Sequence, residues 1–310
     1  MGYGRWTRAS FESYSRGMGR GLTAEGDLDS RYSDRQLFTQ RGLHPTLNPK
    51  NVVRECRDSQ EHPNTLPVIL ALDVTGSMGD ASAQVAKKLN QVMTELYKEV
   101  QDVEFLVMGI GDLAYDQAPI QISQFESDIR IAEQLDRVWM EHGGGSNPYE
   151  SYTAAWYMGL RHTRLDCLKR GRKALIITMG DEPMNPYLPR KPLEQATGDA
   201  LQADVETPGL FREASEVFDL FHIHVDHGVS ARRWPSVEES FGRQLAGGAS
   251  VPGHRGADRG YHRGHREKTR RFPGGFPRNP LGGSHGEAPG GKRGTPNPLV
   301  KEAVPWLAGQ

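Results

Sequence analysis

Residues 66–80 read LPVILALDVTGSMGD, and this stretch decides the fold. Its first seven residues are a continuous apolar run of strand length, which is typical of a strand covered on both faces of a sheet. Asp73 follows directly, and the hydroxyls of Thr75 and Ser77 come next. This spacing leaves two interpretations open. Asp73 forms a turn while Ser77 or Asp80 caps the next helix, or these oxygens hold a charged ligand.

Further strands and helices alternate along the chain downstream of this stretch. Short apolar runs predict strands at residues 103–110, 118–125, 174–180 and 217–225, of which 118–125 alternates like an edge strand. Apolar residues at helical spacing predict helices at 81–100, 127–141, 149–165 and 209–218, with a closing helix at 236–247. Strands that alternate with helices indicate a mainly parallel sheet covered by helices on both faces.

The ligand site of such a sheet lies beyond the carboxyl ends of its strands. This rule places Asp73, Asp112, Asp181 and the pair Asp226-His227 at one edge. A glycine-rich loop with oxygen-bearing side chains, GGGSNP at 143–148, precedes another predicted helix. Carboxylate and hydroxyl oxygens suit a hard cation such as magnesium or calcium. The sequence therefore favours the ligand interpretation over helix capping alone.

Residues 66–245 resemble the von Willebrand factor A (vWA) domains, and the DVTGSM motif is similar to the intracellular bacterial branch of that family. The resemblance implies a doubly wound, Rossmann-like α/β fold with one short antiparallel edge strand, matching residues 118–125. It also implies a metal-ion-dependent adhesion site that holds Mg²⁺, or Ca²⁺ or Mn²⁺. Its ligands would be Asp73, Thr75, Ser77 and Asp181, completed by a residue of the glycine-rich loop.

That last position departs from the family pattern, in which a threonine follows two glycines. Here Ser146 follows Gly144 and Gly145, so we expect Ser146 to be the ligand, with Asn147 as the alternative. Glu150 and Asp112 are nearby candidates for supporting roles, although each is equally well explained as a surface or capping acid.

The resemblance implies a binding function rather than an enzymatic one. In this family an acidic side chain of a partner protein completes the coordination of the ion, and the intracellular bacterial members work beside AAA+ ATPases or in stress and defence assemblies. Hydrolysis would also need a positioned base and an activated water. No candidate base accompanies DVTGS, so we expect a protein-binding module and no catalytic residue.

One motif points instead to an enzyme. Residues 222–227 read HIHVDH, and the pattern of His222, His224, Asp226 and His227 is one by which metal-dependent hydrolases hold two metals. The pattern is that of the metallo-β-lactamase fold, which places the motif early in the chain and takes further His and Asp ligands from later strands. Here only about 83 residues follow the motif, most of them in the predicted tail, so this context argues against that fold. The alternatives are histidines packed in a strand or an auxiliary role at the sheet edge.

Composition divides the chain of 310 residues into three regions, of which residues 66–246 form the predicted domain. Residues 1–65 are polar, and we expect an arm that lies on the domain or awaits a partner. Residues 247–310 carry a net charge of +7 and hold 23 Gly and Pro, which predicts a disordered basic tail. Such a tail, or the aromatic and arginine residues of the arm, would be the route to nucleic acid.

The remaining features of the sequence concern the compartment. Only two cysteines occur, Cys56 and Cys167, far apart and without metal-binding spacing, so neither a disulfide framework nor a structural zinc site is expected. Neither a signal peptide nor an apolar run of membrane-spanning length is apparent. We therefore expect a cytoplasmic protein without a membrane partner.

Overall fold

A five-stranded sheet forms the centre of the protein. The structure is a computed structural model that describes residues 4–100, 102–142, 149–225 and 240. The central strands are β2 (Leu66–Asp73), β3 (Val103–Ile110), β4 (Ile120–Ile122), β6 (Ala174–Gly180) and β9 (Phe218–His224). Their order is β4-β3-β2-β6-β9, in which only β4 runs antiparallel to its neighbour. The predicted mainly parallel α/β sheet with an antiparallel edge strand is thus confirmed.

The register of the sheet aligns the carboxyl ends of its strands. Asp73 at the end of β2 lies opposite Ile110 at the end of β3, and Gly180 at the end of β6 lies opposite His224 at the end of β9. Side chains that follow these strands are therefore brought to one edge of the sheet, as in other open α/β sheets.

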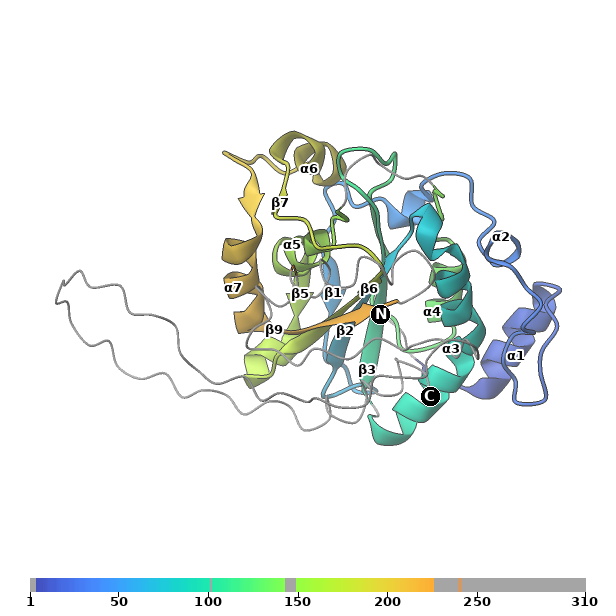
Figure 1. Cartoon of the computed structure of the whole chain (residues 1–310). Coiled ribbons are helices and arrows are strands. Elements are labelled where there is room, and N and C mark those ends of the chain that lie inside the picture. Colours follow the sequence, from blue (N-terminus) through green and yellow to red (C-terminus); the bar gives the residue numbers. More distant parts are fainter. Residues whose placement is uncertain (1–3, 101, 143–148, 226–239, 241–310) are drawn as a thin grey trace, which may run out of the picture.

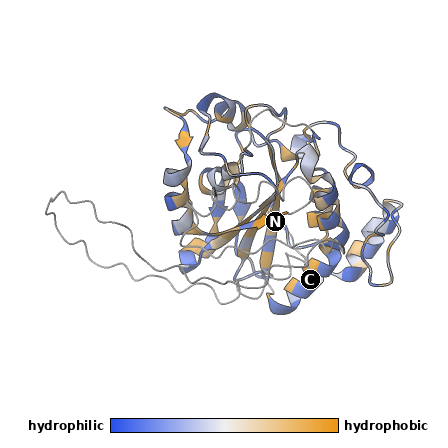
Figure 2. Cartoon of the chain, viewed as in Figure 1, coloured by the Kyte–Doolittle hydropathy of each residue, from blue (hydrophilic) through white to orange (hydrophobic). Residues whose placement is uncertain are grey.

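Helices cover both faces of the sheet, so the domain has three layers (Figure 1). Alternate residues of β2 enter two different apolar clusters, because successive side chains of a strand point to opposite faces. Figure 2 shows that the apolar colour is concentrated on the strands and on the inner sides of the helices. On one face, α3 (Gly79–Glu99) and α4 (Arg130–Leu135) cover the sheet, and α1 (Arg8–Gly17) and α2 (Asp34–Leu37) pack against α3 in the same apolar cluster. The other packs against α5 (Thr153–Arg161), α6 (Arg190–Thr197) and α7 (Thr207–Val217).

Short elements complete the described fold. They comprise the parallel pair β1 (Arg54–Cys56) and β5 (Thr163–Leu165), the antiparallel pair β7 (Tyr187–Leu188) and β8 (Val205–Glu206), and the 3-10 turns η1 (Pro45–Leu47), η2 (Gly76–Met78) and η3 (Asp166–Arg170). None of the helices in the described ranges combines the length and the apolar character needed to cross a membrane.

The first part of the N-terminal segment, from Trp6 to Leu47, joins the apolar cluster of α3 and α4, whereas Val52 and Cys56 belong to the cluster on the other face and β1 pairs with β5. Trp6 and Phe11 are buried in the same apolar cluster as the inner side of α3, and the indole of Trp6 donates a hydrogen bond to Asn90 at 3.2 Å. Arg20 forms an ion pair of 2.8 Å with Asp136, directly after α4. Because both rings are buried, they are not exposed for the base stacking that a nucleic-acid function of the arm would use.

Two predicted helices are shorter than expected. The helix predicted at 127–141 is confined to α4, because the backbone of Trp139 hydrogen-bonds in both directions with the side chain of Gln121 and Glu141 N donates to the carbonyl of Val74. The helix predicted at 149–165 is confined to α5. The backbone of Glu150 pairs with the segment around Met184, and residues 163–165 instead form β5. The closing helix predicted at 236–247, except residue 240, and the tail at 247–310 lie outside the described residues.

Candidate functional site

The turn after β2 is organised by the carboxylate of Asp73. The backbone N–H of Thr75 and its hydroxyl both donate to Asp73 Oδ1, at 2.9 and 2.6 Å. Asp73 therefore does form a turn, as the simpler interpretation proposed. The capping part of that interpretation is wrong, because α3 begins after Met78 and receives no side-chain cap there, so neither Ser77 nor Asp80 caps it.

Ser77 joins this turn to the end of β6. Its hydroxyl lies 3.4 Å from the hydroxyl of Thr75 and donates to Asp181 Oδ1 at 2.9 Å. Asp73, Thr75 and Asp181 are buried, whereas Ser77 is exposed. The structure thus brings together, at one edge of the sheet, the four oxygen-bearing residues that the sequence nominated there. Ser146 and its alternative Asn147 lie outside the described residues.

Tyr152 is part of this cluster and was not anticipated from the sequence. Its hydroxyl donates to Asp73 Oδ2 at 2.7 Å and accepts a hydrogen bond from the backbone N–H of Glu182 at 3.2 Å. The ring is 1% exposed. The only sequence signal for it is its position, just before α5 and beside the glycine-rich loop. Tyr152 therefore fixes the orientation of the Asp73 carboxylate from the opposite side to Thr75.

Further acids surround Asp73 without compensating positive charge. Asp112 and Glu150 are buried, and one carboxylate oxygen of each, Oδ2 and Oε2, has no hydrogen-bond partner. Burial, followed by the charges of Asp73, Asp116 and other acids, raises the pKa of Glu150. Burial likewise raises the pKa of Asp73, although its hydrogen bonds with Thr75 and Tyr152 act in the opposite direction. In the described part of the chain, Asp73, Asp112, Asp116 and Glu150 form no ion pair with a basic side chain.

These residues fit a hard divalent cation by their chemistry. All the donors are oxygens, and buried carboxylate oxygens without a partner are stabilised by a bound positive charge. Within the described ranges, no three His, Cys, Asp or Glu side chains are grouped closely enough to hold a metal. A cation at this position would therefore depend on the hydroxyls of Thr75 and Ser77 as well as on Asp73 and Asp181.

The histidines of β9 lie behind the same cluster. His222 is buried, and its Nδ1 lies 2.9 Å from the hydroxyl of Thr178 in β6. Its ring contacts that of Tyr152, with centroids 5.2 Å apart, and the ring of His224 follows at 6.5 Å. Burial lowers the pKa of His222 well below its usual value, so the ring is neutral. Asp226 and His227, the other members of the hydrolase-like motif, lie outside the described residues.

Comparison with known proteins gives only distant structural likenesses. No family model matches the chain, and no curated protein matches its sequence. The structure is similar to the BatB protein from Bacteroides thetaiotaomicron (15% identity, TM-score 0.32, covering 52% of this chain and 66% of that one). It is also similar to the SpRpn10 VWA domain (10% identity, TM-score 0.34, covering 55% of this chain and 79% of that one). A third likeness is to the pilus adhesin SpaC from Lactobacillus rhamnosus GG (10% identity, TM-score 0.34, covering 57% of this chain and 25% of that one). The chain thus spans just under two thirds of BatB and a quarter of SpaC.

Proposed function

We propose that this protein is a protein-binding module that uses a divalent cation, Mg²⁺ or alternatively Ca²⁺ or Mn²⁺, to bind an acidic residue of a partner. Asp73, Thr75, Ser77 and Asp181 would hold the ion together with Ser146 or Asn147. The observation that supports this most directly is the group of buried acids at the strand ends, where Asp73, Asp112 and Glu150 form no ion pair with a basic side chain in the described part of the chain.

A bound cation would supply the missing positive charge and would present an open position to a partner carboxylate. The residues of the chain have complementary tasks. Asp73 is held between the hydroxyls of Thr75 and Tyr152, so its carboxylate is oriented before any ligand arrives. Among the described members of the set, Ser77 is exposed and lies where a partner can approach. Nothing in this arrangement requires turnover, so we propose binding without catalysis, in an assembly such as the AAA+ ATPase or stress and defence complexes that the vWA resemblance implies.

Cation binding by the purified chain tests this proposal. In isothermal titration with Mg²⁺ or Mn²⁺, we expect saturable binding by the wild type and at least about tenfold weaker binding by Asp73→Asn, because a charged ligand is replaced by a neutral one of the same shape. Asp80→Asn is the matched control, since Asp80 is an exposed acid one turn away. Equal affinities of wild type and Asp73→Asn would contradict the proposed site.

Capture of a partner tests the second half of the proposal. Wild-type chain and Asp73→Asn serve as baits in parallel, each with magnesium and with a chelator. We expect the partner to be retained only by the wild type with magnesium and to be lost when its own acidic residue is replaced. A partner that binds equally under all four conditions would show that binding does not use the cation.

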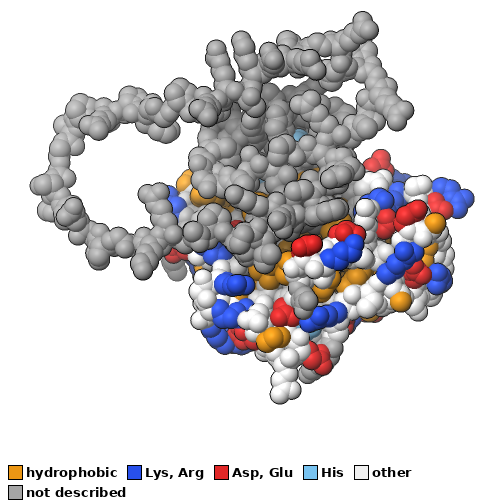
Figure 3. Space-filling model, turned by 90° about the horizontal axis from the view of Figure 1, so that it is seen from below, with side chains coloured by type: hydrophobic (Ala, Val, Ile, Leu, Met, Phe, Trp, Pro, Cys, Tyr) orange, Lys and Arg blue, Asp and Glu red, His pale blue; other side chains and the backbone are white. Residues whose placement is uncertain are grey.

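Two other functions make different predictions. A hydrolase that uses His222 and His224 with Asp226 and His227 would contain stoichiometric zinc that is lost in His224→Ala, a variant that should leave magnesium-dependent binding intact. A nucleic-acid function of the basic tail would be lost on deletion of residues 247–310. Acidic and basic side chains are interspersed over the described part of the face in Figure 3, which does not favour a broad basic surface there.

A further inference from the structure

A hollow lies away from the candidate metal site, between the N-terminal segment and the edge of the sheet. It has a volume of about 610 Å³, within the usual range for small-molecule sites. Glu126 in its wall pairs with Phe105 near the start of β3, whereas Asp73 is aligned with Ile110 at the other end of that strand. Its lining residues come from two segments, Pro45, Thr46, Asn48, Lys50, Val52 and Arg54 on one side and Gln124, Glu126, Arg130, Glu133, Gln134 and Arg137 on the other.

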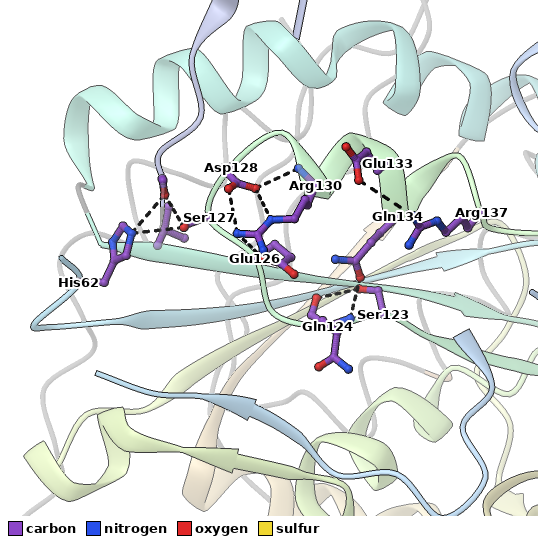
Figure 4. A network of polar contacts seen from close by, with 12 residues as sticks. His62, Ser123, Gln124, Glu126, Ser127, Asp128, Arg130, Glu133, Gln134 and Arg137 are labelled. Atoms are coloured by element: carbon purple, nitrogen blue, oxygen red, sulfur yellow. Dashed lines mark hydrogen bonds and ion pairs between the residues drawn. The ribbon is translucent and has the colours of Figure 1, made fainter. Parts of the chain in front are cut away.

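Part of the charge in this hollow is neutralised internally. Arg130 contacts Glu126 at 3.1 Å and also forms a two-bonded pair with Asp128, at 2.9 Å for each bond. Arg137 faces Glu133 at 4.0 Å. Figure 4 shows these pairs side by side along α4 and the loop before it. Glu126 and Glu133 in the wall are therefore each paired with an arginine, and Arg130 is shared between Glu126 and Asp128.

Arg54 and Lys50 are the other two basic side chains that line the hollow. In the described part of the chain neither forms an ion pair with an acid. Arg54 is 7% exposed, and its Nη2 donates to the carbonyls of Thr46 and Ile122 at 2.9 and 3.0 Å. These two bonds fix the guanidinium at the wall of the hollow, while its Nε is buried without a hydrogen-bond partner. A buried, uncompensated guanidinium is costly unless an anion or hydrogen-bond acceptor reaches it.

We propose that this hollow binds a small hydrophilic molecule through an oxyanion group, a phosphate or a carboxylate, held by Arg54 and Lys50. Both hydrogens of Arg54 Nη2 are used by the two carbonyls and Nε is buried, so an oxyanion would accept from Nη1, in a hydrogen bond strengthened by the charge of the guanidinium. The amides of Asn48, Gln124 and Gln134 also line the hollow and would hydrogen-bond the rest of the ligand. The concave shape between two segments of the chain favours a small molecule over a flat protein surface.

Titration of the full chain with simple oxyanions tests this site. The protein is first freed of divalent cations and dialysed into a chloride buffer, and orthophosphate and citrate are then titrated separately at constant ionic strength. We expect at least one of them to bind saturably by calorimetry and to raise the thermal midpoint, since a ligand of the native state stabilises it. Tighter binding of orthophosphate would identify a phosphoryl ligand, and tighter binding of citrate a carboxylate ligand.

Three variants locate the binding. Lys50→Gln should weaken it about two- to fivefold, as for an exposed charge, and Arg54→Gln at least about tenfold. Lys191→Gln, an exposed lysine of α6 outside the hollow, should bind like the wild type. If Arg54→Gln does not fold, the comparison of anion affinity between Lys50→Gln and Lys191→Gln tests the site. The proposal is overturned if neither anion binds saturably or if Lys50→Gln and Lys191→Gln have equal affinities.

Discussion

The hydroxyl of Tyr152 offers the sharpest test of how the Asp73 carboxylate is held. Tyr152→Phe removes one oxygen atom and leaves the ring in its buried position, so the change isolates two hydrogen bonds. One is donated to Asp73 Oδ2 at 2.7 Å, and the other is accepted from the backbone of Glu182 at 3.2 Å. No other side chain is expected to move into the space of a single hydroxyl.

The magnitude follows from these two contacts. A hydrogen bond to a charged group contributes about 1.5–3 kcal/mol, and a neutral one about 0.5–1.5 kcal/mol. Because both partners of Tyr152 are buried or half-buried, water does not readily replace the lost hydroxyl. We therefore expect Tyr152→Phe to lower the free energy of unfolding by roughly 2–4 kcal/mol in the absence of divalent cations.

Urea unfolding followed by circular dichroism, with a chelator present and linear extrapolation to water, measures this difference. Tyr187→Phe is the control, because Tyr187 is an exposed tyrosine of β7, and it should change the stability by less than about 0.5 kcal/mol. A loss of less than about 1 kcal/mol in Tyr152→Phe would refute the reasoning, since it would mean that the hydroxyl does not orient Asp73.

Three further predictions concern packing and charge. Gly180→Ala should destabilise the protein by about 3 kcal/mol in urea unfolding, because an added Cβ would overlap with the phenol of the buried Tyr152; a neutral effect would contradict the tight contact. Arg20→Met should cost about 3 kcal/mol in the same assay, since it removes the cation from the largely buried carboxylate of Asp136 and leaves it the hydroxyl of Tyr14. Burial raises the pKa of Asp199, but its hydrogen bonds with Tyr157 and His162 outweigh burial and lower the pKa below its usual value. The stability from Asp199 is thus present above its unfolded-state pKa of about 3.9 and is lost as the pH falls through the lower folded value, so Asp199→Asn should flatten the acid limb of the stability curve.

The central strands were predictable because nearly all their side chains are buried against apolar neighbours. β2, β3 and β6 are covered on both faces, so their sequences are almost uninterrupted apolar runs. The turn residues Asp73 and Ser77 were predictable for a related reason, since polar oxygens directly after such a run must face the edge of the sheet. These parts of the fold are encoded locally.

The missed parts depend on contacts between distant residues. Gln121 stops the helix after α4 by bonding the backbone of Trp139, and no pattern within 127–141 announces that partner. Tyr152 reaches Asp73 across 79 positions of the chain. The apolar residues of the N-terminal segment are too widely spaced to suggest a helix face, and they acquire a role only because α3 and α4 provide the surface on which Trp6 is buried.

That burial of Trp6 defines how the protein can be divided. Apolar residues from Trp6 to Leu47 pack in the same cluster as α3 and α4, and Trp6 N also donates to the carbonyl of Ser127 in the loop before α4. A fragment cut at Leu66, where the sheet begins, would expose this covered surface to water and to other copies of itself. A fragment that keeps this surface covered must therefore include Trp6, and the segment that looked like an accessory arm forms part of the core of the domain.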